Sequence, residues 1–186
     1  MPDFDGLNLT PSKTEIWREI NHYTHWRQVG SSGQDDWVAL KFEGLVDIRQ
    51  TGEWTFATNS DDGSNIWIGD KLVVNNDGTH GARERSGKIG LQAGLHAIRV
   101  EYFEYHSGAF IEVKMGGPGQ PWGIIPPHLW KHASPHPPPA PLSGEPEPLP
   151  LSAYECQPGV DVAYYNLSGP KSTTMPNFAT MTPYKT

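Results

Sequence analysis

The chain has 186 residues, enough for one domain with a sizeable core and an extension, and its formal net charge is -7. It carries no basic run, which argues against nucleic acid and anionic membrane surfaces as partners. No stretch approaches the roughly 20 consecutive apolar residues that cross a bilayer, so membrane insertion is not expected. The seven tryptophans and seven tyrosines favour a β-rich fold, whereas the 18 prolines and 20 glycines indicate that part of the chain lies outside a core.

Along the chain, residues 14–20 form a weak helix candidate, and the segment 37–115 is predicted to consist of consecutive strands. Val38, Leu40 and Phe42 recur at every second position, as side chains do on one face of a strand. The stretches GEWTFATNS and GAFIEVKM show the same alternation. Short strands are therefore expected to follow one another closely in this part of the chain.

Turn signals separate these strands. Gly69-Asp70 lies between two short apolar runs and is typical of a tight hairpin. Ala93-Gly94 divides two longer apolar runs in the same way. Strands of this kind, without a long helix between them, predict an all-β fold, an antiparallel sandwich or barrel, over residues 1–132.

A proline-rich stretch follows this domain. Half of the positions in PHPPPAPLSGEPEPLP are proline, which excludes a helix or a central strand, so residues 133–152 are predicted to form an extended polyproline linker. Strand character returns in residues 153–186, where Val160, Val162 and Tyr164 alternate with polar or small side chains.

The two ends of the chain resemble each other. The opening MPDF returns as MPNF near the C-terminus, and the Thr-Pro and Lys-Thr pairs that follow it return in the same order. This echo indicates that a second copy of a repeat begins within the C-terminal segment. Met1 is then expected to be an internal residue of a longer chain.

The central segment resembles a known family. The stretch GEWTF, the motif SDDGS, the hairpin IWIGDKLVVNNDGTHG, the strand pair LQAGLHAIRVEYFE and the closing GPG occur in the order typical of the anthrax protective-antigen fourteen-kilodalton (PA-14) domain. The resemblance covers residues 4–130. It implies a β-sandwich of a kind found in extracellular adhesins, toxins and glycosidases, and the better-known members of the family bind carbohydrate.

Domains of this family usually open with a strand similar to GVDVAYYNLSG, which in this chain stands beyond the linker, at Val160–Leu167. A sandwich without its opening strand has an unpaired edge, which favours the addition of a strand. Val160, Val162 and Tyr164 are therefore expected to complete a sandwich, for which a neighbouring copy is favoured. The alternatives are that they fold back into their own domain or that this segment only opens the next repeat.

The resemblance also implies a metal site. In carbohydrate-binding adhesins of the family, two consecutive aspartates joined by a cis peptide bond hold a calcium ion that contacts sugar hydroxyls. Asp61 and Asp62 fall on that motif. The resemblance implies that the remaining ligands come from the loop between the last two predicted strands. By position there, the candidates are Glu104, the carbonyl of His106 and Gly108. Calcium takes about six to eight oxygen ligands, mostly carboxylates and carbonyls, which suits this set.

Other interpretations of these acidic residues stay open. Asp-Asp-Gly-Ser is also a good turn sequence, in which aspartate accepts backbone N–H groups. Glu104 replaces an amide side chain found in some relatives, and the additional negative charge argues against the sugar geometry. A second acidic pair, Asp35-Asp36, is expected to lie in a solvated loop.

The sequons NLT and NLS make Asn8 and Asn166 candidate glycosylation sites of a glycoprotein. No nucleophile elbow, phosphate loop or pair of separated acids is apparent, so an enzyme is not expected. An extracellular or cell-surface location agrees with the resemblance.

These observations favour a structural function. The chain is expected to be the repeating unit of an extracellular fibre or long surface protein, a homopolymer in which each PA-14-like sandwich receives a strand from a neighbouring copy. The alternative is a calcium-dependent carbohydrate-binding module or adhesin, with glycans as partners and calcium as cofactor.

Overall fold

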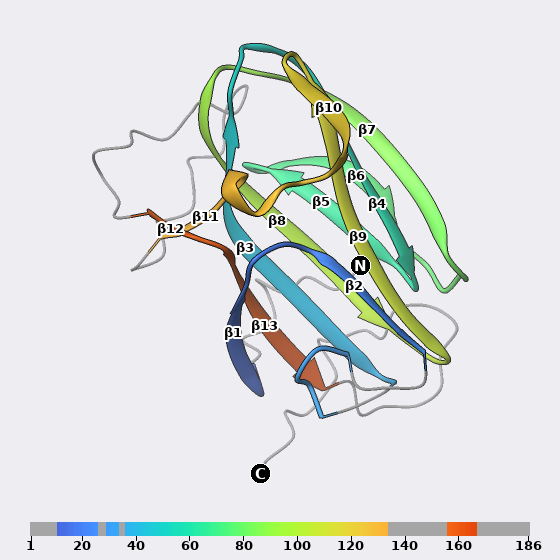
Figure 1. Ribbon diagram of the computed structural model, residues 1–186. Coiled ribbons are helices and arrows are strands. Elements are labelled where there is room, and N and C mark those ends of the chain that lie inside the picture. The colour runs from blue at the N-terminus through green and yellow to red at the C-terminus, as the bar shows by residue number, and fades with distance from the viewer. Residues whose placement is uncertain (1–10, 26–28, 34–35, 134–155, 167–186) are drawn as a thin grey trace.

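The computed structural model describes residues 11–25, 29–33, 36–133 and 156–166. Most of these residues belong to two antiparallel β-sheets that face each other (Figure 1). The predicted all-β sandwich is therefore confirmed. The expected polyproline linker and both halves of the MPDF echo lie outside the described residues. In the part of the chain that is described, no helix combines the length and the apolar character that a membrane span needs.

The first sheet has the strand order β1-β13-β3-β8-β5-β6, with β11 paired to β3 and β12 paired to β11. Its strands are β1 (Lys13–Trp17), β13 (Val160–Asn166), β3 (Val38–Ile48), β8 (Gly94–Glu104), β5 (Ser64–Ile68), β6 (Lys71–Asn76), β11 (Trp130–Ala133) and β12 (Cys156–Pro158). The two long strands β3 and β8 pair with each other from end to end and form the centre of the sheet.

The second sheet has the strand order β10-β9-β4-β7, with β2 also paired to β9. Its strands are β10 (Gln120–Ile124), β9 (Gly108–Gly117), β4 (Gly52–Asp61), β7 (Arg83–Leu91) and β2 (Asn21–His25), and a short 3-10 helix, η1 (Pro127–Leu129), precedes β11.

Both predicted turns are present, but they do different things. At Gly69-Asp70 the chain turns between β5 and β6, which pair as a hairpin, and Gly69 adopts a φ of 55° that favours glycine. At Ala93-Gly94 the chain turns between β7 and β8, which lie in different sheets. This second turn therefore carries the chain from one face of the core to the other.

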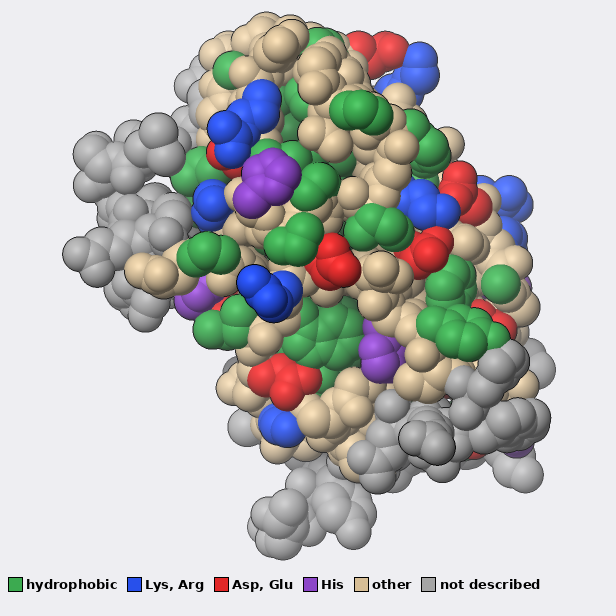
Figure 2. Space-filling view, in the orientation of Figure 1, with side chains coloured by type: hydrophobic (Ala, Val, Ile, Leu, Met, Phe, Trp, Pro, Cys, Tyr) green, Lys and Arg blue, Asp and Glu red, His purple; other side chains and the backbone are tan. Residues whose placement is uncertain are grey.

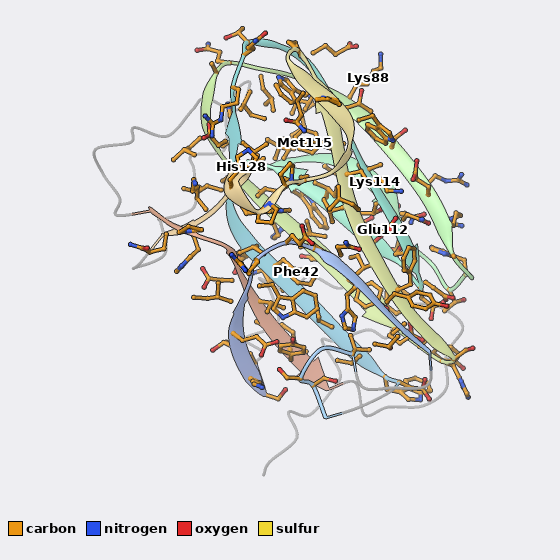
Figure 3. The ribbon with its side chains drawn as sticks, in the orientation of Figure 1. Phe42, Lys88, Glu112, Lys114, Met115 and His128 are labelled. Carbon is orange, nitrogen blue, oxygen red and sulfur yellow. The ribbon has the colours of Figure 1, made fainter. Side chains whose placement is uncertain are left out.

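The core fills the space between the two sheets. The alternation in β3 and β4 places Phe42 and Trp54 there, both fully buried, and Figure 3 shows Phe42 on β3. Full burial of a large apolar side chain contributes roughly 2–3 kcal/mol to stability. Charged side chains of both signs are distributed over the surface in Figure 2, and Lys114 and Glu112 of β9 form an ion pair of 2.9 Å (Figure 3).

The C-terminal strand lies inside the first sheet. β13 is antiparallel to β1 on one side and to β3 on the other, so that Tyr164 stands opposite both Lys13 and Leu40 (Figure 1). Val160, Val162 and Tyr164 are buried in the core. The segment expected to enter a neighbouring copy thus completes the sandwich of its own chain, where both strand edges and the apolar side chains are satisfied.

The weak helix candidate at residues 14–20 is wrong. Its first half forms β1, because the backbone of that segment pairs with β13 over five residues. The side chains of Glu15 and Trp17 also bond to Tyr164 of β13. Pairing with a strand from the other end of the chain overrides the local preference.

Candidate metal centre

Three carboxylates meet at one end of the sandwich. Asp61 ends β4, Asp62 follows it directly, and Glu104 ends β8 in the opposite sheet. One oxygen from each side chain lies within 4.8 Å of the others. The peptide bond between Asp61 and Asp62 is cis. Two strand ends from different sheets therefore bring together the three acidic residues that the sequence singled out.

Glu104 is fully buried. Its Oε2 accepts a hydrogen bond of 3.0 Å from the hydroxyl of Tyr102, whereas Oε1 is buried without a hydrogen-bond partner among the described residues. Burial and the negative charge of Asp62 raise the pKa of Glu104 to about 9, although the bond from Tyr102 lowers it. A buried carboxylate oxygen without a donor is costly unless a proton or a cation satisfies it.

Asp62 is held by backbone N–H groups from two loops. Its Oδ1 accepts the N–H of His80 at 2.7 Å, and its Oδ2 accepts the N–H of Tyr105 at 2.9 Å. Burial raises the pKa of Asp62 in spite of these bonds, and burial together with the charge of Asp62 raises that of Asp61. A simple turn does not account for these bonds, because the donors lie 18 and 43 residues away along the chain, and it gives no reason for Glu104 to lie beside Asp62.

A buried polar network fixes the loop that carries His80. Asn76, fully buried at the end of β6, donates to Ser60 Oγ at 3.1 Å and to the carbonyl of Arg83 at 3.0 Å, and it accepts from Arg83 Nε at 2.8 Å. Ser60 in turn donates to the carbonyl of Asp62 at 2.6 Å. These residues were not predicted from the sequence, where the signal for them is the polar NNDG at the end of an apolar hairpin strand.

The loop that carries Tyr105 has a support of its own. Asp36 Oδ1 accepts the N–H of Ser107 at 3.0 Å, and the ring of Trp37 packs edge-on against Tyr105 with 4.6 Å between ring centroids. Asp36 was expected to lie in a solvated loop; it lies in the loop before β3 with 31% of its side chain exposed, and it also braces the turn between β8 and β9. Asp35 lies outside the described residues.

The other predicted site residues are His106, Gly108 and the two glycosylation candidates. His106 is exposed in the loop after Glu104, and Gly108 is the first residue of β9. The side-chain oxygens that lie within 4.8 Å of one another come from Asp61, Asp62 and Glu104. Among the glycosylation candidates, Asn166 ends β13 with its backbone opposite Val38, and Asn8 lies outside the described residues.

The donor set fits a hard divalent cation. It offers three carboxylates and neither thiol nor imidazole, and oxygen ligands of this type are those that calcium prefers. Glu104, whose Oε1 is buried without a hydrogen-bond partner among the described residues, belongs to the set. A cation of charge 2+ at this point would supply the counter-charge that three adjacent carboxylates lack.

Comparison with known proteins identifies the family. The model of the PA14 domain matches residues 5–121, and the chain therefore belongs to the PA14 domain family. The chain is also 35% identical over 95 residues to the anti-sigma-I factor RsgI3 of Acetivibrio thermocellus. That match covers 50% of this chain and only 15% of the relative.

Two solved structures have the same fold and a related name. An anti-sigma factor domain-containing protein matches with a TM-score of 0.60 and 25% identity, over 70% of this chain and 44% of the other. An anti-sigma factor domain-containing protein from Clostridium clariflavum matches with a TM-score of 0.61 and 24% identity, over 68% and 44% of the two chains. The chain thus spans less than half of the length of each of these proteins.

These findings correct the expected function. The fibre repeat and the homopolymer of strand-exchanging copies are wrong, because the relatives are named as anti-sigma factor proteins, which are regulators. The same similarity also argues against the alternative, a carbohydrate-binding adhesin with glycans as partners. The physical basis of the fibre is also missing, since β13 occupies the sheet of its own chain.

Proposed function

We propose that this PA14 domain is the calcium-binding module of a regulatory protein of the anti-sigma-factor class. The observation that carries the proposal is the position of Glu104 beside Asp61 and Asp62, with its Oε1 buried and without a hydrogen-bond partner in the described part of the chain. The similarity to anti-sigma factor proteins at 35% and 25% identity supports the regulatory context. Since the chain spans a minor part of these relatives, the sigma factor is proposed as the partner of the whole protein.

Calcium at this position would do more than neutralise charge. Asp62 is bonded to the N–H groups of His80 and Tyr105, which belong to two different loops. An ion that binds Asp62 therefore fixes both loops at once and gives the end of the sandwich a defined surface. We propose that this surface is the ligand-responsive part of the regulator and that it binds without catalysis.

The module is proposed to work outside the cell. Asp61 is only partly buried, so the site is accessible to ions. Calcium sites of extracellular modules bind with dissociation constants of about 10⁻⁴ to 10⁻³ M, which suits the high calcium concentration outside cells. The net charge of -7 also favours a divalent cation over an anionic partner.

Thermal unfolding with and without calcium tests the metal site. Asp62→Asn removes one charge at the centre, and Asp70→Asn is the matched control in the exposed β5–β6 turn. We expect calcium at about 100 times its Kd to stabilise the wild type and D70N by about 2.7 kcal/mol, and D62N by far less. An equal calcium response in D62N, or none in the wild type, would contradict the site.

The regulatory part of the proposal requires the whole parent protein. We expect a sigma factor to copurify with it, and we expect D62N to change transcription from the promoters that this sigma factor serves, whereas D70N leaves transcription unchanged. If no sigma factor copurified with the parent protein, the regulatory assignment would be contradicted, whereas the proposed calcium site would be unaffected. The two halves of the proposal thus fail separately.

A further inference from the structure

We propose that Tyr102 is a positioning residue of the metal centre. Its hydroxyl holds Oε2 of Glu104, so that the other oxygen, Oε1, is left for the ion. This inference rests on the proposed calcium site. It adds a residue that does not contact the ion itself.

The geometry of β8 carries the argument. Tyr102 and Glu104 are two residues apart on the same strand, so both side chains project to the same face of the sheet. Tyr102 is fully buried, and its hydroxyl lies 3.0 Å from Glu104 Oε2 and 2.6 Å from the carbonyl oxygen of Asp61. One O–H group thus connects the end of β8 with the end of β4 in the opposite sheet.

The two bonds have a joint effect on the ligand set. Because Oε2 is engaged, Glu104 can present Oε1 without rotating, and this is the oxygen that has no other partner among the described residues. The hydroxyl has one proton, which the two acceptor oxygens share, and the contact with the carbonyl of Asp61 holds the ring of Tyr102 in place beside Glu104. A site held in this way loses little freedom when the ion enters.

The competing interpretation is that Tyr102 only fills the core. Tyr102→Phe distinguishes the two, since it keeps the buried ring and removes the hydroxyl alone. Tyr164→Phe is the matched control, because Tyr164 is also buried and also donates to a glutamate, Glu15, but lies two strands away in β13. A purely structural role would lower the stability of both variants and leave calcium affinity unchanged in both.

Calorimetric titration with calcium, at a temperature where circular dichroism shows each protein folded, tests the inference. Removing a group that orients a metal ligand weakens metal binding by about 10- to 100-fold. We expect Y102F to bind calcium at least about tenfold more weakly than the wild type, and Y164F to bind like the wild type. Equal affinities of Y102F and the wild type would overturn the inference alone, whereas absence of binding by the wild type would overturn the metal site.

A second comparison tests whether Tyr102 acts through Glu104. In a Glu104→Gln background, where calcium binding is expected to be weak and is measured at raised calcium concentrations, the addition of Y102F is expected to change calcium affinity by less than about twofold, because the carboxylate that Tyr102 orients is already gone. This pair also serves if Y102F alone does not fold. A tenfold difference within the pair would show that Tyr102 acts by another route and would overturn the inference.

Discussion

Two glutamates of this domain each bind a buried tyrosine in the same sheet, yet their pKa values move in opposite directions. Glu104 of β8 accepts from Tyr102, and burial together with the charge of Asp62 raises its pKa to about 9. Glu15 of β1 accepts from Tyr164 of β13, and its pKa is lowered to about 2. The same type of pair therefore produces a neutral acid in one place and a firmly ionised one in the other.

The number of donors explains the difference. Burial alone would raise the pKa of Glu15, but hydrogen bonds from Ser31 Oγ at 2.6 Å, from Tyr164 and from Trp17 Nε1 at 2.6 Å outweigh it. The ammonium group of Lys13 lies 3.5 Å from the same carboxylate. Among the described residues, Glu104 instead has a single hydrogen-bond donor, Tyr102, and the charges of Asp62, Asp61 and Asp36 all raise its pKa. A carboxylate with several hydrogen-bond donors stabilises the folded state. A carboxylate with few donors and with other negative charges nearby is suited to binding a cation.

The largest effect is expected when Glu104 is changed to glutamine. Glu104 has a raised pKa, so near neutral pH it takes up a proton on folding, and this costs stability at every pH above its ordinary pKa. Glutamine resembles the protonated acid. We expect E104Q in chelator to be more stable than the wild type at pH 7, by about 1–3 kcal/mol, and equally stable near pH 4. Denaturant unfolding at the two pH values measures this.

The same variant should lose the calcium response. Wild type at about 100 times its Kd gains about 2.7 kcal/mol from calcium, and E104Q should gain little. A variant that is less stable in chelator and still responds to calcium would show that Glu104 is a structural acid like Glu15, and the contrast between the two pairs would fail.

Acid unfolding sharpens the other side of the contrast. The folded pKa of Glu15 is depressed, so its contribution is complete above its ordinary pKa and is lost as the pH falls from about 4.5 towards about 2. We expect Glu15→Gln to remove about 1–2 kcal/mol at pH 7, after allowance for partial solvent exposure, and to flatten this acid limb. Glu53→Gln is the control, because Glu53 and its partner Lys88 are both largely exposed. If stability still fell at acid pH in E15Q as it does in the wild type, a group other than Glu15 would be responsible for this acid limb.

Much of the fold could be predicted because the relevant patterns are local. The alternation of Val38, Leu40 and Phe42 is enough to predict β3, and Gly69-Asp70 is enough to predict the β5–β6 hairpin. The strand β1 could not be predicted in this way, since its partner β13 lies near the other end of the chain. The echo between the termini does not specify which sheet a strand enters. The sequence therefore could not show whether β13 pairs within its own chain or with a neighbouring copy, as the fibre interpretation required.

The site divides in the same manner. Asp61, Asp62 and Glu104 could be predicted because a motif and a loop position mark them. Tyr102 and Asn76 could not, because their roles arise only where the ends of strands from two sheets meet. A tyrosine in a strand and an asparagine before a turn are ordinary residues in the sequence. Only their distances to the carboxylates give them a function.

The smallest effect is expected from Ser31→Ala, which removes one donor from Glu15 and leaves Tyr164 and Trp17 in place. The loss of a hydrogen bond to a charged group that stays partly solvated should cost about 1 kcal/mol. If the number of donors sets the contrast between the two glutamates, the pKa of Glu15 must also rise in S31A, towards its ordinary value. An NMR titration of the Glu15 carboxyl carbon measures it, and Ser32→Ala in the neighbouring position is the control. A pKa that does not move in S31A would mean that the remaining donors alone hold Glu15 ionised, and counting donors would then fail to explain why Glu104 behaves differently.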